Sequence, residues 1–419
     1  MTTAAGAGDE PETVLVRVSG PDRPGITAGL MGVLSNADAE VQDIEQIVIR
    51  QRLSLGVVIA VPQGRDLLKE LLLFGWEHEV DVDFELVDRK PTEHRQASIV
   101  NVLGVELSPN DIAAVAKVIA QSGGNIERIV RLSNYPVMSY ELLVEGADET
   151  LLRELLIETR QHRSIDMSVQ RDGLARRATR LVVLDVDSTL IQDEVIDLLA
   201  EEAGCVSAVA SITEEAMRGE LDFEASLRKR VELLKGLDEE AIDRVWARLR
   251  FTPGARTFVR TLKRLGYRVA IVSGGFTRLA DRIADDLDLD HAHANTLEIV
   301  DGHLTGRITG PVVDRERKAE LLSQIAADEG IPLNQTVAVG DGANDVAMLN
   351  AAGLGIAFCA KPVVRAAVDT ALSVPYLDAV LFLLGVSREE IEQADAEDPN
   401  TPQVRMVPTG HDWAQRPTA

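Results

Sequence analysis

The chain has 419 residues and carries 68 acidic against 43 basic side chains, a formal net charge of −25 at pH 7. This excess of negative charge argues against nucleic acid as a partner, because binding the phosphate backbone requires clustered lysine and arginine. Two cysteines are too few for a disulfide framework, no apolar run reaches the roughly 20 residues of a membrane span and the start lacks a signal peptide, so we expect a cytoplasmic protein of several domains.

The N-terminal third contains two similar segments. Residues 14–20 and 98–104 are apolar strands that end at glycine, and each is followed by an amphipathic helix, at 26–36 and 110–122. A second strand begins near Ile44 and near Ile126, and each copy then continues with a strand, a helix and a strand. The repeat predicts two consecutive βαββαβ domains, at residues 12–90 and 96–172.

This repeat resembles the ACT family of regulatory domains, which have a ferredoxin-like fold and commonly bind amino acids at paired interfaces. The loop that begins at Gly20 and contains Asp22 carries the resemblance in the first copy, whereas the second copy keeps Gly104 without the full loop. The resemblance implies a regulatory ligand at Gly20, Asp22 and Gly104, with L-serine as the expected effector. The alternative is that the two copies only form a homodimer by pairing their sheets.

Four polar motifs lie farther along the chain, most of them directly after predicted strands. Asp185 and Asp187 follow the apolar residues 181–184, and side chains two apart in an extended chain share a face. Residues 273–275 and 340–345 follow the strands 269–272 and 336–339, and each reads as a tight glycine turn that opens a helix. Lys318 begins another helix between these two motifs.

The four motifs, at residues 181–190, 273–275, 318 and 340–345, resemble in order those of the haloacid dehalogenase superfamily of aspartate-nucleophile phosphotransferases. The resemblance implies a Rossmann-like α/β domain at 178–390, with a parallel sheet covered by helices on both faces. It also implies that Asp185 is the nucleophile and Asp187 the general acid/base. The metal ligands would be Asp185, Asp341 and the backbone carbonyl of Asp187, with Asp345 behind them holding metal-bound waters.

The chemistry of phosphate ester hydrolysis explains why these residue types occur together. A phosphate dianion resists attack by a carboxylate, so a cation and fixed donors must neutralise the site. Hard carboxylate oxygens suit Mg²⁺, which we expect as the cofactor. By resemblance, Ser273 and the Gly274 N–H would hold phosphate oxygens, Asn344 would position the group, and Lys318 would neutralise both the phosphate and the catalytic Asp185.

The insertion between the first two motifs predicts a helical cap at about residues 193–250. Apolar residues recur at three- and four-residue spacing over 193–203, 207–217, 223–234 and 238–248. Glu194, Met217, Phe223 and Arg230 resemble the substrate-reading set of superfamily members that act on O-phospho-L-serine in the last step of L-serine biosynthesis. Arginine can grip a carboxylate in a bidentate manner, and glutamate can hold an ammonium group. The alternative is that the two charges are solvated and that Met217 and Phe223 form the core of the cap.

The remaining segments complete the domain. Asp301-Gly302 predicts a hairpin, and residues 353–358 and 371–374 predict the last strands. His291 and His293 lack a third ligand nearby, so we interpret them as structural. Residues 90–94 and 171–177 are the expected domain junctions, and a disordered tail is expected at 394–419. Two other functions stay open, a phosphatase or phosphotransferase for another small phosphorylated amino acid or alcohol, and an amino-acid sensor with a vestigial catalytic domain.

Overall fold

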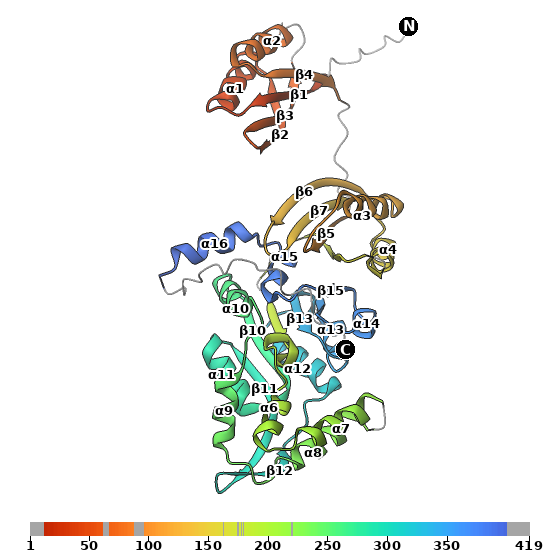
Figure 1. Cartoon of the computed structure of the whole chain (residues 1–419). Coiled ribbons are helices and arrows are strands. Elements are labelled where there is room, and N and C mark those ends of the chain that lie inside the picture. Colours follow the sequence, from red (N-terminus) through yellow and green to blue (C-terminus); the bar gives the residue numbers. More distant parts are fainter. Residues whose placement is uncertain are drawn as a thin grey trace, which may run out of the picture. The chain divides into compact units, whose positions relative to one another are not determined.

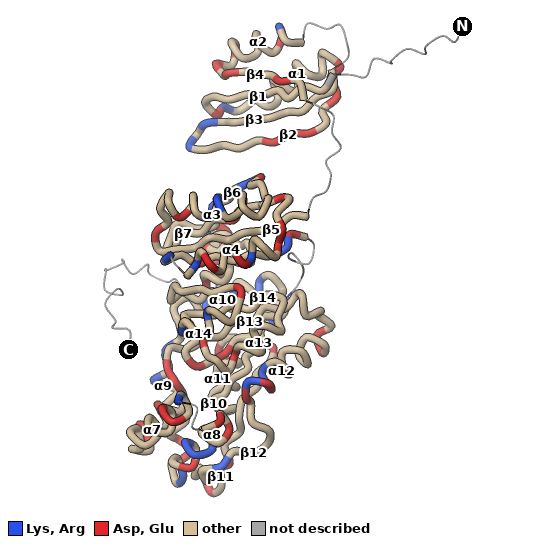
Figure 2. Tube along the Cα trace, turned by 90° about the vertical axis from the view of Figure 1, so that its right-hand side faces the viewer, with Lys and Arg blue, Asp and Glu red and all other residues tan. Residues whose placement is uncertain are grey.

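The structure is a computed structural model that describes residues 12–61, 67–87, 96–161, 163–173, 176, 178, 180–218 and 221–399. The chain forms two compact units, residues 1–94 and residues 95–419 (Figure 1), each of which is described by itself. The expected junction at 90–94 and residues 400–419 of the expected tail lie outside the described residues. Figure 2 shows basic and acidic residues interspersed along the described part of the chain.

The first unit is a single βαββαβ domain. Its antiparallel sheet has the order β2-β3-β1-β4, and α1 and α2 lie together over the apolar face of that sheet. The elements are β1 (Glu12–Pro21), α1 (Ile26–Asn36), β2 (Glu40–Ile49), β3 (Arg52–Val61), α2 (Leu67–His78) and β4 (Asp81–Leu86). The outer strand β2 is exposed along its whole length.

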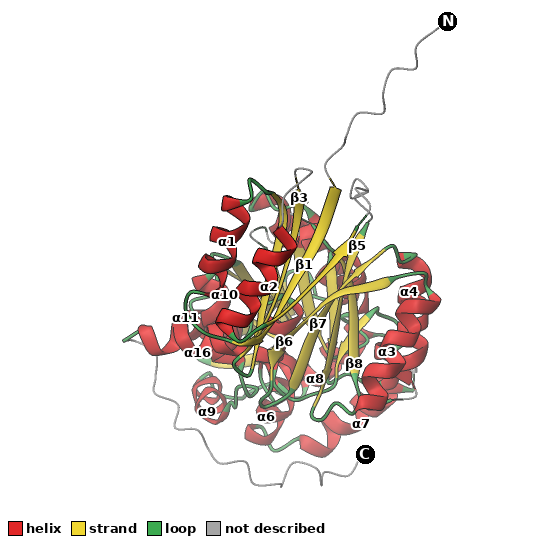
Figure 3. Ribbon diagram, turned by 90° about the horizontal axis from the view of Figure 1, so that it is seen from above, coloured by secondary structure: helices red, strands yellow, loops and turns green. Residues whose placement is uncertain are grey.

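The second unit begins with a copy of this domain. Its sheet order, β6-β7-β5-β8, matches that of the first copy strand for strand, which confirms the repeat. The elements are β5 (Ala97–Gly104), α3 (Pro109–Gln121), β6 (Asn125–Ser133), β7 (Met138–Glu145), α4 (Glu149–Gln161) and β8 (Asp166–Arg171). In Figure 3, α3 and α4 lie side by side along one face of this sheet.

The rest of the second unit is an α/β domain around a seven-stranded sheet of order β12-β11-β10-β9-β13-β14-β15. All neighbouring strands are parallel except the hairpin β11–β12. The strands are β9 (Leu181–Leu184), β10 (Arg268–Phe276), β11 (His291–Val300), β12 (His303–Thr309), β13 (Thr336–Gly340), β14 (Leu354–Phe358) and β15 (Thr370–Leu372). This confirms the predicted fold class.

Helices cover both faces of this sheet. Along β9, Val182 and Leu184 pack toward one layer, whereas Leu181 and Val183 pack toward the other, because successive side chains of a strand point to opposite faces. The helices are α10 (Ala255–Arg264), α11 (Thr277–Leu287), α12 (Arg315–Asp328), α13 (Val346–Ala351), α14 (Pro362–Arg365), α15 (Val380–Leu383) and α16 (Arg388–Glu397), with short 3-10 turns at η2 (Leu333–Gln335) and η3 (Leu377–Ala379).

The predicted cap forms four helices between β9 and α10, as the apolar spacing indicated. They are α6 (Val195–Glu202), α7 (Val206–Met217), α8 (Phe223–Glu232) and α9 (Glu240–Arg248). Within the described residues, no helix is both long and apolar enough to cross a membrane.

Polar side chains join the second βαββαβ domain to the α/β domain. The buried Arg160 of α4 donates to the carbonyl oxygens of Arg365, Val368 and Asp369 at 2.8, 3.3 and 3.1 Å. The buried carboxylate of Asp166 accepts from both the backbone N–H and the hydroxyl of Ser373. These contacts satisfy buried polar groups on both sides, so the two domains form one folded unit.

Two expectations from the sequence are wrong. The tight glycine turn at 273–275 does not occur, because β10 continues through these residues to Phe276 and α11 begins at Thr277. The tail does not start at residue 394, because α16 runs to Glu397 and Asp395 forms ion pairs with Arg260 and Arg264 at 2.6 and 2.5 Å. Acidic residues in this helix are therefore held by basic residues of α10.

Candidate active site

Asp185 and Asp187 lie at the carboxyl end of the central strand β9. Residues 181–184 are all apolar, which allows this short strand to be buried on both faces of the sheet. The backbone then turns sharply through η1 (Val186–Leu190), where Ser188 has a φ of 56°. Asp185 Oδ1 accepts from the Val186 N–H at 2.8 Å. Asp187 Oδ1 accepts from the Val195 N–H at 2.7 Å, and its Oδ2 accepts from the Ser273 hydroxyl at 3.2 Å.

Lys318 is fully buried and bridges two carboxylates. Its Nζ lies 2.8 Å from Asp185 Oδ1 and 2.7 Å from Asp345 Oδ1. Burial disfavours the ammonium form, but the charges of Asp185 and Asp345 outweigh this effect and raise the pKa of Lys318. Asp314 caps α12 by accepting from the Arg317 N–H, which fixes the start of the helix that carries the lysine.

Three carboxylates gather into a cluster that could hold a metal ion. One oxygen from each of Asp185, Asp341 and Asp345 lies within 4.8 Å of the others. Asp345 is completely buried, and its Oδ2 accepts from the Gly342 N–H at 2.9 Å, so both of its oxygens already have partners. Asp185 and Asp341 are therefore the more available ligands of the three.

The pKa values in this cluster are raised, as expected for carboxylates that share a buried space. Burial, followed by the charge of Asp345, raises the pKa of Asp185 well above its ordinary value and that of Asp341 to about 6. Burial also raises the pKa of Asp187. Excess negative charge of this kind favours binding of a divalent cation.

The glycines of the second and fourth motifs permit close approach of neighbouring groups. A Cβ on Gly275 would lie 2.9 Å from Ser273 Oγ and 3.0 Å from Asp187 Oδ2. A Cβ on Gly342 would lie 2.1 Å from the side-chain oxygen of Asn344, which places that amide against the motif. Ser273 is itself oriented by the Gly275 N–H, which donates to its hydroxyl at 2.7 Å.

Side chains of the cap converge on the same site. Glu194 is exposed as a residue, whereas its carboxylate points into the site, where Oε1 accepts from the Ser188 hydroxyl at 2.8 Å. Burial and the charge of Asp187 raise the pKa of Glu194 to about 7. Burial lowers the pKa of the Arg230 guanidinium, whereas the nearby carboxylates of Asp197 and Glu194 oppose that shift. A positive and a negative group of the cap thus lie within electrostatic range of Asp187.

Phe223 closes the site beside the second motif. Its ring atom Cζ lies 3.2 Å from the position that a Cβ on Gly274 would take. Phe223 also packs against the main apolar core, so it serves the cap core and the site together, as the sequence left open. The side chain of Met217 lies outside the described residues.

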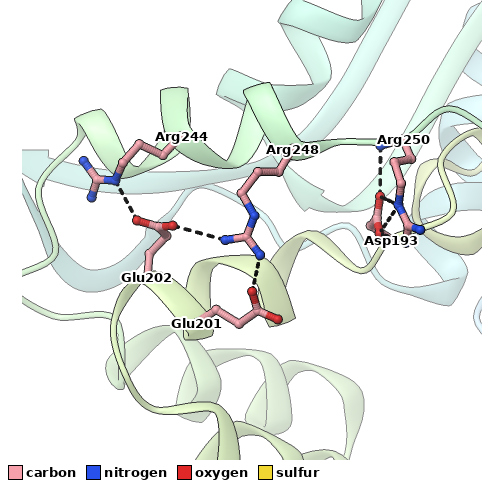
Figure 4. A network of polar contacts seen from close by, with 6 residues as sticks. All are labelled: Asp193, Glu201, Glu202, Arg244, Arg248 and Arg250. Atoms are coloured by element: carbon pink, nitrogen blue, oxygen red, sulfur yellow. Dashed lines mark hydrogen bonds and ion pairs between the residues drawn. The ribbon is translucent and has the colours of Figure 1, made fainter.

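The two ends of the cap are fastened together next to the site. Arg250 Nη2 lies 2.5 Å from Asp193 Oδ1, and the Gln192 N–H donates to the Arg250 carbonyl at 2.9 Å. Figure 4 shows this pair beside a second group, in which Arg244 and Arg248 of α9 reach across to α6, where Glu202 accepts from both and Glu201 pairs with Arg248. These contacts connect the first and last helices of the cap.

Several residues that sequence reasoning missed support the site. The Thr189 hydroxyl donates to Asp341 Oδ1 at 3.0 Å, and Ser188 holds Glu194. Because Ser188 and Thr189 directly follow Asp187 in the sequence, their place in the motif could have indicated these supporting roles. The buried Asn295 donates to the Gly274 carbonyl at 2.8 Å and accepts from the Val313 N–H at 2.8 Å. No motif surrounds Asn295, so only the fold reveals its role.

The residues expected to bind a regulatory ligand lie at equivalent places in the two copies. Gly20 and Gly104 belong to the ends of β1 and β5, and the exposed Asp22 follows β1. Close packing alone explains why both positions are glycine, since a Cβ at Gly20 would lie 2.8 Å from Val80 Cγ1 and a Cβ at Gly104 would lie 3.0 Å from a backbone oxygen.

His291, interpreted from the sequence as structural, lies on β11, and its Nε2 is 2.7 Å from Glu329 Oε1.

Comparisons with known proteins agree with this architecture. The family model of haloacid dehalogenase-like hydrolases matches residues 182–350, and two ACT domain models match residues 12–85 and 97–170. Both resemblances found in the sequence are thus confirmed.

Named relatives match along nearly the whole chain. The chain is 53% identical to a phosphoserine phosphatase of Streptomyces coelicolor, over 91% of this chain and 94% of that protein. It is 48% identical to a phosphoserine phosphatase of Mycobacterium tuberculosis, over 92% and 96%. It is also similar to the crystal structure of a probable phosphoserine phosphatase from Vibrio cholerae, with a TM-score of 0.55 and 35% identity over 73% of this chain and 91% of that one.

Proposed function

Because the chain belongs to the phosphoserine phosphatase family of haloacid dehalogenase-like hydrolases, we propose that it hydrolyses O-phospho-L-serine to L-serine and inorganic phosphate. The observation that carries this proposal is that Glu194 and Arg230 of the cap both lie within electrostatic range of Asp187, with Glu194 bound to the neighbouring Ser188 hydroxyl. A zwitterionic amino acid presents a carboxylate and an ammonium group together, and this pair of side chains is complementary to both.

The reaction proceeds in two steps on Asp185. A carboxylate oxygen of Asp185 attacks phosphorus while the bond to the seryl oxygen breaks, and Asp187 gives its proton to that oxygen. Asp187, now ionised, then takes a proton from a water molecule, whose oxygen attacks phosphorus and releases phosphate from Asp185. The raised pKa of Asp187 supports this role, and the contacts with Val195 and Ser273 fix its two oxygens.

Lys318 and a divalent ion would neutralise the negative charge of the phosphate and of the carboxylates. Lys318 holds Asp185 in place and supplies a positive charge beside the attacked phosphate. Mg²⁺ is the proposed cofactor, held by Asp185, Asp341 and the backbone carbonyl of Asp187, with Asp345 oriented behind them by Lys318 and the Gly342 N–H. When bound, the ion would offset the charge of the phosphate and of the carboxylates.

Phosphate release from O-phospho-L-serine, measured with and without Mg²⁺, tests the proposed activity directly. The matched variant Asp185→Asn removes the nucleophile while conserving the shape of the side chain. We expect the variant to fold normally, as judged by circular dichroism, and to release no phosphate above background. Normal turnover by a folded Asp185→Asn protein would exclude the aspartyl-phosphate route. If the wild-type enzyme hydrolysed other phosphate esters but not phosphoserine, phosphoserine would be excluded as the substrate.

L-serine is the proposed effector at the ACT domains. Asp22 is exposed directly after β1, where an effector could reach it. L-serine, as a product, should also compete with the substrate at the active site. Inhibition by L-serine should therefore contain a competitive part from the active site and a non-competitive part from the ACT domains. We expect Asp22→Ala in the full-length enzyme to remove only the non-competitive part. Purely competitive inhibition in the wild-type enzyme would contradict the effector role.

A homodimer formed through the ACT domains is the proposed assembly. The outer strand β2 exposes Ile44, Ile47 and Ile49, and the outer strand β6 exposes Ile129. An apolar outer strand with free backbone groups favours pairing with a strand of a second copy. We expect a dimer in analytical ultracentrifugation at micromolar concentration and dissociation by Ile47→Lys. A monomeric wild-type protein would contradict this assembly.

A further inference from the structure

A cavity lies between the second ACT domain and the α/β domain, within one folded unit. Its volume is about 340 Å³. Its walls come from α4 and β8, from the segment that leads into β9, and from the loops around β14 and β15, and the charged residues among them include Arg153, Asp172, Arg176, Arg180 and Asp369. This size suits a small metabolite.

The cavity is separate from the active site. Arg180 directly precedes β9, whereas Asp185 directly follows it, so the two residues lie at opposite ends of the same strand. Leu354 and Thr370, which also line the cavity, are the first residues of the parallel strands β14 and β15. The cavity therefore lies at the amino-terminal edge of the sheet, away from the edge that carries the aspartates. Its occupant is not a substrate positioned for phosphate transfer.

Arg180 is a buried cation without a carboxylate partner in the described part of the chain. Only 4% of its surface is exposed. One guanidinium nitrogen, Nη2, donates to the Arg176 carbonyl at 2.5 Å, while the buried Nε has no hydrogen-bond partner among the residues that the structure describes. Burial, together with the neighbouring charge of Arg176, lowers the pKa of this guanidinium. A buried charge of this kind is costly unless a counter-ion satisfies it.

The other charges of the cavity are mostly paired. Arg176 lies 2.5 Å from Glu141, and both side chains are about nine-tenths buried. Arg153 lies 3.1 Å from Glu149 and 2.5 Å from Asp369.

The charges that remain are unequal in number. Among the described lining residues, Arg171 and Arg180 are cations without an ion pair, against one carboxylate, Asp172. Because Arg153 faces two carboxylates, the walls together with Glu141 hold four arginines and four carboxylates, and what distinguishes the cavity is the buried guanidinium of Arg180 without an ion pair among the described residues.

We propose that this cavity binds a small oxyanion, a phosphate or a carboxylate, through the guanidinium of Arg180. A guanidinium donates two parallel hydrogen bonds to either group. Inorganic phosphate and L-serine, the two products of the proposed reaction, are the two sources of this chemistry that we would test first. Asp172 distinguishes them, because its carboxylate repels phosphate and attracts the ammonium group of serine.

Hydrogen–deuterium exchange of the full-length enzyme, read peptide by peptide, locates binding at the cavity separately from binding at the active site. We expect phosphate or L-serine, compared with chloride at equal ionic strength, to slow exchange in peptides covering 169–173 and 349–355. We expect Arg180→Gln to raise the Kd for this protection at least tenfold. Arg307→Gln, which removes the same charge from the exposed strand β12, should leave it unchanged.

The Asp172→Asn variant identifies the source of the oxyanion and does not depend on the folding of Arg180→Gln. We expect it to tighten phosphate binding several-fold if phosphate is the occupant, and to weaken L-serine binding if serine is. Absence of protection at the cavity with both anions would overturn the proposal, as would full protection in a folded Arg180→Gln protein. Phosphoserine hydrolysis is measured separately on the same preparations, so failure of either proposal is recognised independently.

Discussion

Replacing Lys318 with methionine should damage both stability and turnover, because this lysine holds two buried carboxylates. Its Nζ lies 2.8 Å from Asp185 and 2.7 Å from Asp345, and none of the three side chains is more than 6% exposed. Removing one partner of a buried ion pair costs about 3–5 kcal/mol in the free energy of unfolding. This corresponds to a decrease of about 1–2 M in the urea midpoint at an m-value of about 3 kcal/mol/M.

The loss of stability in Lys318→Met should depend on pH. Without the ammonium group, the pKa of Asp185, already raised by burial and by the charge of Asp345, rises further. A carboxyl group whose pKa is raised by folding destabilises the folded state fully above the raised pKa and not at all below its unfolded value, near 4. The difference from wild type in urea midpoint should therefore be larger at pH 8 than at pH 5.

Urea unfolding in EDTA measures this difference without a divalent ion that could replace the lost charge. Lys361→Met, at an exposed position, is the matched control and should change the free energy of unfolding by less than about 0.5 kcal/mol. The double variant Lys318→Met with Asp345→Asn should recover part of the stability and none of the activity. We expect kcat on phosphoserine to fall by about 10²–10³ in Lys318→Met. A decrease below tenfold, or equal destabilisation at both pH values, would refute the reasoning.

Three further predictions concern the side chains around Asp185. Asp187→Asn should lower the rate constants of both phosphorylation and hydrolysis by about 10²–10⁴, and rapid-quench kinetics with one step unchanged would contradict a dual acid/base role. Arg230→Ala should raise KM for phosphoserine at least tenfold more than for p-nitrophenyl phosphate, which lacks a carboxylate; equal increases would argue against carboxylate binding by Arg230. Since the pKa of Glu194 is raised to about 7, KM for phosphoserine should increase as pH falls below about 7, when protonation removes the charge that attracts ammonium. Glu194→Gln should show a high KM without this pH dependence, and an unchanged profile in the variant would assign the titration to another group.

Much of the site could be predicted from the sequence because its residues occur in short local patterns. The apolar run 181–184 predicted a buried strand, and the aspartates that follow it had to lie at its carboxyl end. Helical spacing likewise predicted the four cap helices, to within two residues at their ends. Where a local rule failed, as at the expected turn of 273–275, the glycines serve close packing against Asp187 rather than a turn.

Local pattern and spacing in the sequence by themselves determined the repeat of two βαββαβ domains, the α/β domain with its cap and the identity of the acidic and basic residues at the strand ends. Only the tertiary structure decided that Lys318 joins Asp185 to Asp345, that Asn295 supports Gly274 and that Arg180 faces a cavity without a carboxylate partner among the described residues. The physical reason is that strand and helix patterns depend on neighbours within a few residues. Burial of a charge and its choice of partner depend instead on segments that packing brings together from distant parts of the chain.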